Sequence, residues 1–255
     1  MADVTVPWAY IDNFTRSIHD LDAISQELLA DSLANTNLED KRAVASLMRS
    51  ICRTSNDAAT QLSTQFYRGM SLMQTGKDMT HKVTSGYDEV ATDVAVSAIM
   101  RDTEGDLEAL GRQLGERLAY EINRASKRGV YRAGQADGRD VRYARVPVGA
   151  ETCAWCLMTA GLGYWYMTEE AASHSHAHCD CAIIPSIGRG DVVLEGYDST
   201  EYRDMWRTAN QMRVDGDIPP ELQERIAREK AVKGKAYRED TNGTLAVMRW
   251  AYGLK

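Results

Sequence analysis

The sequence contains 255 residues, with 30 basic and 37 acidic side chains and a formal net charge of −7. Its hydrophobic fraction of 44% and charged fraction of 26% lie close to globular averages, which excludes a fully disordered or collagen-like chain. The acidic balance argues against a general nucleic-acid binder but leaves room for a local basic patch.

The N-terminal half carries helical patterns. Apolar residues recur there at three-, four- and seven-residue spacing, which predicts one buried helical face. The residues of this first stripe are Ile11, Phe14, Ile18, Leu21 and Leu28. After a break at residues 33–37, Asn37 is the expected N-cap of a second helix, whose apolar stripe runs from Val44 to about Met73.

Two further helices are expected before residue 138. The first spans about residues 89–100, and the second follows a capping box made by Thr103 and Asp106. Gly129 and Gly134 are the positions at which we expect that helix to end. Its apolar stripe consists of Leu107, Leu110, Leu114, Leu118 and Ile122.

The composition changes after Gly138, where short strands and loops are predicted. Strands are expected at 141–149 and 181–186, with a turn and a short strand at 157–167. Helices are expected at 199–214, from Pro219 to about 230, and at 245–254 after a loop at 239–244.

The expected fold class is therefore mainly α with a small α+β module. We divide the chain into a helical region at 1–138, a Cys/His module with short strands at 139–190, and C-terminal helices at 191–255. No 18-residue stretch is free of charged and polar residues, so we expect no transmembrane helix or membrane anchor. Residues 1–8 lack the pattern of a secretory signal, which predicts synthesis in a reducing cytoplasm.

Cysteine and histidine are concentrated in one window. Cys52 stands apart on a helical stripe and is expected to be an inert buried thiol. The other four Cys and three of the five His lie between residues 153 and 181, with the spacing C-x2-C, nineteen residues, H-x2-C-x-C. Two close ligand sets separated by a loop are typical of tetrahedral zinc. The candidate ligands are Cys153, Cys156, His176, Cys179 and Cys181.

Five candidates compete for four zinc positions. We favour Cys153, Cys156, His176 and Cys179, with Cys181 as the replacement for His176 in an all-thiolate site. His174 and His178 are weaker candidates, because alternating residues of a strand point to opposite faces. The alternatives to metal binding are a disulfide, such as one between Cys153 and Cys181, and unbonded buried thiols.

A structural zinc is expected rather than a catalytic one, because protein ligands can fill every position and no HExxH helix supplies a base. Glu169 and Glu170 lie between the ligand sets, but they lack the spacing from His that a zinc deaminase requires. We expect them in a solvated loop or a first helical turn. The sequence also lacks a phosphate-binding Gly loop and a G-x-S-x-G elbow, so we expect no enzyme.

A basic segment precedes the cysteine window. Within residues 124–145, seven basic and two acidic side chains give a local charge of +5. Contact with phosphate or with an acidic protein surface is one interpretation, and a solvated helix end followed by a strand is the other. The basic residues are Arg124, Lys127, Arg128, Arg132, Arg139, Arg142 and Arg145.

Residues 145–185 resemble the C-terminal module of tailed-phage minor head proteins of the Mu F-like (head morphogenesis) family. They are most similar to the minor capsid proteins of actinobacteriophages. The resemblance is carried by the C-x-x-C pair, the Gly–aromatic segment 163–166, the H-x-x-C-x-C motif and the apolar residues 183–185. Residues 195–206 also resemble the segment that follows in the actinophage branch. The family often has Pro after the motif His, where this chain has Ala177.

The resemblance implies a structural protein of the virion, made in a bacterial host and located in the capsid interior or at the portal vertex. Family members join the head during assembly, associate with the portal or the capsid, and in some cases are thought to leave with the DNA. About 70 residues follow Pro185, too few for a typical catalytic domain. The alternative function is a zinc-containing module that binds nucleic acid through residues 124–145.

Overall fold

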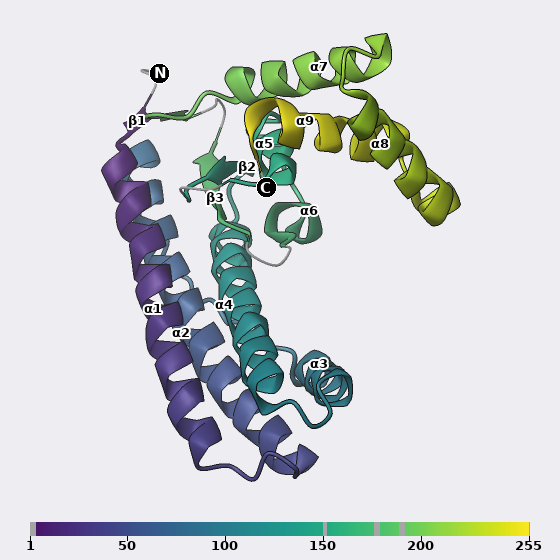
Figure 1. The fold of residues 1–255 in the computed structure, drawn as a ribbon. Helices are drawn as coiled ribbons and strands as arrows, with labels where there is room; N and C mark the ends of the chain where they lie inside the picture. Colours follow the sequence, from purple (N-terminus) through teal and green to yellow (C-terminus); the bar gives the residue numbers. More distant parts are fainter. Residues whose placement is uncertain (1–3, 150–151, 176–178, 189–191, 255) are drawn as a thin grey trace.

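The computed structural model describes residues 4–149, 152–175, 179–188 and 192–254 (Figure 1). Three long helices lie side by side as a bundle: α1 (Trp8–Ala34), α2 (Lys41–Thr75) and α4 (Leu107–Asp137). The shorter α3 (Glu89–Asp102) packs against α2 and α4 near the end of the bundle that is remote from the strands. The expected fold class, mainly α with a small α+β module, is confirmed.

The apolar stripes form the core of the bundle, with two corrections. Leu29 is buried, whereas Leu28 is 50% exposed. Leu29 follows Ile18 by eleven residues, or three helical turns, which returns it to the same face. Leu107, in the first turn of α4, is also exposed.

Two predicted helix starts were wrong. Asp40, not Asn37, caps α2, and its carboxylate accepts hydrogen bonds from the backbone of the first turn. Asp106 alone caps α4, because Thr103 belongs to the C-terminal end of α3. A carboxylate at an N-cap satisfies free N–H groups and also interacts favourably with the helix dipole, which explains the choice of Asp at both positions.

Gly129 and Gly134 do not end a helix, contrary to the prediction. Helix α4 continues to Asp137 and ends at Gly138, which adopts a left-handed φ of 73°. The two interior glycines instead allow close packing. A Cβ on Gly129 would lie 2.7 Å from the Cβ of Ser63 in α2, so α2 and α4 approach more closely than larger residues permit.

Strands β2 (Val141–Pro147) and β3 (Cys181–Ile187) form an antiparallel pair next to one end of the bundle. Both were predicted from the sequence. The segment between them differs from the prediction of a turn and a strand, since it contains helix α5 (Ala154–Ala160) and a single bridge between Tyr166 and Tyr143. The N-cap of α5 is Cys153, a residue type outside the usual capping set, so no capping signal marks the start of this helix.

A second pair of strands was not predicted. Strand β1 (Thr5–Val6) lies parallel to β4 (Val193–Leu194), and the backbone N–H of Trp8 donates to the Glu195 carboxylate at 3.0 Å. These contacts join the start of α1 to a segment almost 190 residues later. Each strand has two residues, too few to show an alternating pattern.

The C-terminal helices are α7 (Ser199–Asp215), α8 (Pro220–Lys233) and α9 (Thr244–Tyr252). The predicted loop before α9 is a π-helical turn, Glu239–Gly243, that leads directly into it. Their apolar side chains form a separate core that includes Ala154 and Leu157 of α5. Helix α5 therefore connects the C-terminal helices with the β2–β3 pair. No helix of the described ranges has both the length and the apolar character required to cross a bilayer.

Candidate metal centre

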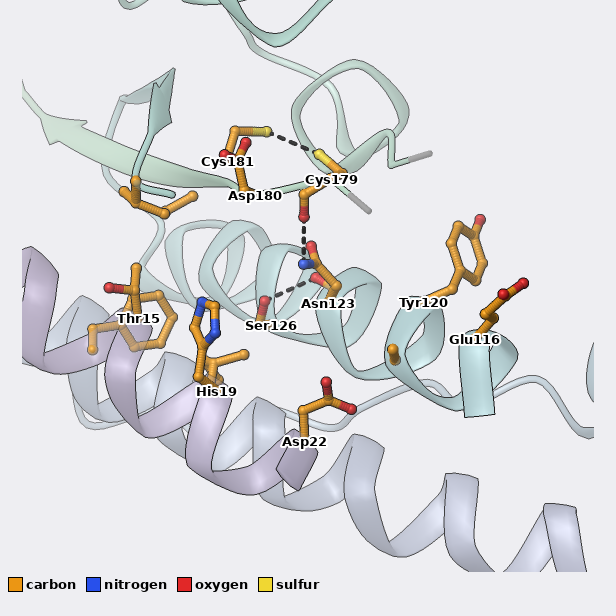
Figure 2. Close-up of a pocket in the computed structure, with 15 residues that line it drawn as sticks. Thr15, His19, Asp22, Glu116, Tyr120, Asn123, Ser126, Cys179, Asp180 and Cys181 are labelled. Carbon is orange, nitrogen blue, oxygen red and sulfur yellow. Dashed lines mark hydrogen bonds between the residues drawn. The ribbon is translucent and has the colours of Figure 1, made fainter. Parts of the chain in front are cut away.

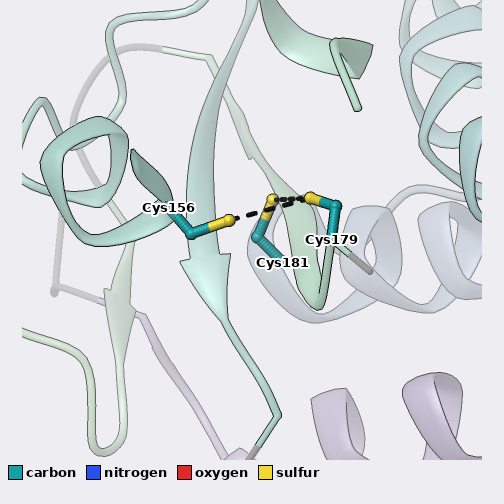
Figure 3. A group of neighbouring side chains, drawn as sticks. All are labelled: Cys156, Cys179 and Cys181. Atoms are coloured by element: carbon teal, nitrogen blue, oxygen red, sulfur yellow. Dashed lines mark hydrogen bonds between the residues drawn. The ribbon is translucent and has the colours of Figure 1, made fainter. Parts of the chain in front are cut away.

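Three cysteine side chains converge beside α5 (Figure 3). The Sγ atom of Cys179 lies 3.7 Å from that of Cys156 and 3.3 Å from that of Cys181. All three side chains are buried, and their sulfur atoms lie within 4.8 Å of one another. Segments separated by more than twenty residues thus supply one compact sulfur cluster.

Local structure explains this convergence. The Cys153 thiol accepts the backbone N–H of Cys156 at 3.3 Å, which starts α5 and places Cys156 in its first turn. Cys179 and Cys181 are two residues apart on an extended segment that becomes β3, so their side chains share a face. The carboxamide of Asn123 in α4 donates to the Cys179 carbonyl at 2.6 Å and fixes this segment on the bundle.

The sulfur spacing fits a tetrahedral metal ion. Metal–sulfur bonds of about 2.3 Å at tetrahedral angles place neighbouring sulfurs about 3.7 Å apart. Thiolate sulfur is a soft donor, which selects soft or borderline metals over magnesium or calcium. The three buried cysteines therefore have the donor chemistry and the spacing to hold a metal.

Two buried cations contact the cluster. Lys127 Nζ donates to Cys179 Sγ at 2.9 Å and to Ser175 Oγ at 3.1 Å. Arg145 Nη2 donates to Cys181 Sγ at 2.9 Å and lies 3.8 Å from Cys179 Sγ. Lys127 is 1% exposed and Arg145 is fully buried. The cations make the surroundings of the sulfurs strongly positive.

The pKa shifts show how the sulfurs and cations influence one another. Contacts with Cys153, Cys179 and Cys181, together with burial, raise the pKa of the Cys156 thiol. Burial lowers the pKa of the Arg145 guanidinium, but the nearby sulfurs of Cys181 and Cys179 outweigh it and the pKa is raised. Crowded thiols resist joint ionisation, and a metal ion bound between them would stabilise their thiolate forms.

The structure places the other predicted ligands differently. Cys153 is half-buried and packs against the three-sulfur cluster. His176 and His178 lie outside the described residues. His174 is exposed, and its ring lies tilted against that of Trp155, with ring centroids 5.2 Å apart. Cys181, the alternative ligand of the sequence prediction, stands directly beside Cys179.

Cys52 is separate from this site. Its side chain is fully buried in the bundle, as predicted. Burial is the main reason that its pKa is raised to about 12, and the nearby Glu121 adds to the shift. The thiol therefore stays protonated and unreactive at neutral pH.

Sequence reasoning missed the roles of Lys127 and Arg145, which it counted as part of a basic surface. Arg145 lies within a strand between Ala144 and Val146, and these apolar neighbours are the signal that it is buried. Lys127 carries no comparable signal, because the polar residues around it in α4 range from partly to fully buried.

Other residues of the basic segment also have intramolecular partners. Glu169 lies in the first turn of α6 (Glu169–Ser173), as predicted, and pairs with Arg128 at 2.6 Å and Arg132 at 3.2 Å. Arg139 pairs with Asp137 and donates to the Thr75 hydroxyl. Much of the local positive charge is thus used to fix the cysteine module and strand β2 on the bundle.

A cavity of about 270 Å³ lies beside the cluster, between α1, α4 and the start of β3 (Figure 2). Its wall includes Asp22, Glu116 and Asp180 as well as the aromatic ring of Tyr120. Thr152 donates to the Asp180 carboxylate at 3.2 Å, while burial raises the pKa of that carboxyl group. Cys179 and Cys181 belong to both the cluster and the wall of the cavity, and the other described residues that line the cavity contain no sulfur.

A comparison with models of known protein families identifies the family of this chain. The family model described as VG15 protein matches residues 7–209, which include the bundle, the cysteine cluster and most of α7. No match to a curated protein or to a solved structure was found. Since the matched region covers most of the sequence, the chain belongs to the VG15 family of phage-associated viral proteins.

Proposed function

We propose that this chain is a minor head protein of a phage virion, of the Mu F-like kind, that joins the portal or the major capsid protein during head assembly. The observation that carries the proposal is the VG15 family match, which spans the helical bundle and the cysteine module together. The resemblance of residues 145–185 to minor head proteins supports the same function. The location that follows is the capsid interior or the portal vertex.

In this proposal the cysteine cluster holds a structural zinc ion that cross-links two parts of the fold. We call this cross-link the staple. A zinc ion bound by Cys156, Cys179 and Cys181, with Cys153 or His176 as the fourth ligand, links α5 to β3. Strands β2 and β3 bury their apolar residues in the core of the bundle, whereas helices α5 and α6 are short, and metal binding commonly stabilises small elements of this kind. Because α5 also packs against the C-terminal helices, the zinc ion fixes these helices relative to the bundle.

We assign the zinc a structural rather than a catalytic role, and the absence of enzymatic activity stays a prediction. A catalytic zinc keeps a position open for water or substrate. Here the three sulfurs are buried and covered by Lys127 and Arg145. Contact with packaged DNA through the basic segment has less support, because these two cations are buried and Arg128, Arg132 and Arg139 pair with acidic side chains.

Metal content of the purified full chain tests the staple. We expect about one zinc per chain, as in closed structural sites, and loss of zinc in Cys156→Ala and Cys179→Ala. Cys52→Ala is the matched control, since it removes a buried thiol outside the cluster and is expected to keep the zinc. A folded wild-type chain with no metal and with reactive thiols at Cys153, Cys156, Cys179 and Cys181 contradicts the proposal.

Analysis of purified phage particles tests the function itself. Quantitative mass spectrometry is expected to find the protein in mature virions, in far fewer copies than the major capsid protein. Particles from a phage lacking the gene are expected to show defects in head assembly or in DNA content. Presence of the protein in infected cells but not in particles contradicts a virion role.

A further inference from the structure

Among the residues that the structure describes, Lys127 and Arg145 have no acidic partner at the cluster. None of the ion pairs formed within this part of the chain involves either side chain. Lys127 donates there to Ser175 and Cys179, and Arg145 donates to Cys179, Cys181 and two backbone carbonyls. Of the described groups that accept hydrogen bonds from these cations, the sulfur atoms are the ones that can supply negative charge.

Buried charges require compensation. Removing an ammonium or guanidinium group from water costs several kcal/mol unless an opposite charge and hydrogen bonds replace the lost hydration. Neutral thiols do not supply that charge. Four thiolates around a divalent ion carry a net charge of −2, which two cations cancel. Three thiolates and a neutral histidine carry −1 and leave one buried cation uncompensated.

We propose that the metal centre is a four-thiolate site, with Cys153, Cys156, Cys179 and Cys181 as ligands, and that Lys127 and Arg145 balance its charge. This inference rests on the metal centre of the proposed function and selects its ligands. Lys127 and Arg145 act through the ligands and are therefore positioning residues.

The two cations come from different parts of the fold. Lys127 belongs to α4 of the bundle and contacts Cys179, whereas Arg145 belongs to β2 and contacts Cys181. Arg145 is further held by the Ala172 carbonyl at 3.1 Å and by the Trp155 ring, whose centroid lies 4.8 Å from its guanidinium carbon. Charge-assisted hydrogen bonds from two elements therefore orient the sulfurs and tie the metal centre to the bundle.

X-ray absorption of the zinc-loaded full chain tests the ligand set. We expect four sulfur neighbours at about 2.3 Å and no nitrogen at about 2.0 Å. Three sulfurs and one nitrogen overturn the four-thiolate site while leaving a zinc protein. A wild-type chain that binds no zinc overturns both this inference and the proposed staple, so the two failures are distinct.

Zinc affinity, measured by competition with a chelator, tests the cations. Lys127→Met and Arg145→Met are expected to weaken zinc binding by about 10- to 100-fold, as loss of outer-shell partners commonly does. Lys127→Arg retains the charge and is expected to recover most of the affinity. Arg112→Met, which removes an exposed cation from α4, is the matched control and is expected to change nothing.

Cobalt spectra provide a second readout. The sulfur-to-cobalt charge-transfer bands of Co²⁺-loaded protein are expected to shift in Lys127→Met and not in Arg112→Met, because a hydrogen bond to sulfur lowers the energy of its electrons. Circular dichroism verifies that the bundle is folded in each variant. If Arg145→Met does not fold, the Lys127 variants alone test the role of the cations. Zinc affinities and cobalt spectra equal to wild type in Lys127→Met overturn the role of the cations.

Discussion

The Tyr143 hydroxyl occupies the space that a side chain at position 134 would take. A Cβ on Gly134 would lie 1.9 Å from Tyr143 Oη, and this hydroxyl donates to the Tyr131 carbonyl at 3.0 Å. The contact lets strand β2 lie directly against α4, since Tyr143 is fully buried. The position of the cysteine module on the bundle thus depends on the absence of one methyl group.

Gly134→Ala is therefore expected to destabilise the protein by about 1–3 kcal/mol, the usual cost of forcing extra volume into a packed core. Gly111→Ala is the matched control in the same helix, where a Cβ has no neighbour within 4 Å. That variant is expected to be more stable than wild type by about 0.5–1 kcal/mol, because alanine loses less entropy in a helix than glycine. Urea unfolding measures both, and equal effects contradict the packing argument.

Gln74 completes the free edge of β3. Its side-chain amide donates to the Pro185 carbonyl at 2.8 Å, and its oxygen accepts the Ile187 N–H at 2.8 Å. Gln74→Ala is expected to cost about 1–3 kcal/mol, because it leaves buried backbone groups unpaired. Hydrogen exchange at the Ile187 amide is expected to accelerate. Gln65→Ala, at an exposed position of the same helix, is the control and is expected to leave this exchange rate unchanged.

The Glu169 ion pairs predict a pH dependence of stability. Burial raises the pKa of this carboxyl group, but hydrogen bonds and charge from Arg132 and Arg128 outweigh it, so the pKa is lowered on folding. A carboxylate with a lowered folded-state pKa stabilises the protein above its unfolded pKa, and this contribution is lost as the pH falls through the folded value.

Glu169→Gln is accordingly expected to reduce the free energy of unfolding at pH 7 and to have a progressively smaller effect below about pH 4, the usual range of a glutamate. Urea unfolding across this range measures the difference from wild type. Glu170→Gln alters the exposed neighbour and is expected to show little effect at any pH. A Glu169→Gln effect that grows on acidification contradicts the assignment.

Metal removal is expected to act unevenly on the fold. Chelation should loosen α5 and the C-terminal helices that pack on it. The apolar core shared by α1, α2, α4, β2 and β3 is independent of the sulfurs, so it should stay protected. Hydrogen exchange with and without chelator measures this contrast. Uniform acceleration along the chain contradicts a local staple.

Much of the fold follows from local patterns. Regular apolar spacing predicted the long helices, and alternation predicted β2, because these patterns reflect burial of one face against a single core. Helix α5 was missed because its cap is a thiol, and the β1–β4 pair because two-residue strands carry no pattern. The prediction of a helix end at Gly129 and Gly134 was wrong. A glycine that ends a helix and a glycine that allows close packing cannot be distinguished in one sequence.

The candidate site divides in the same way. The sequence by itself determined the sulfur chemistry, because the close spacing of Cys153 with Cys156 and of Cys179 with Cys181 is a local property. Only the tertiary structure decided that Cys181 stands with Cys179 and Cys156, and that Lys127 and Arg145 face the sulfurs. Burial and charge pairing depend on contacts between segments that are distant in the sequence. The close packing of β2 against α4 at Gly134 brings these segments together.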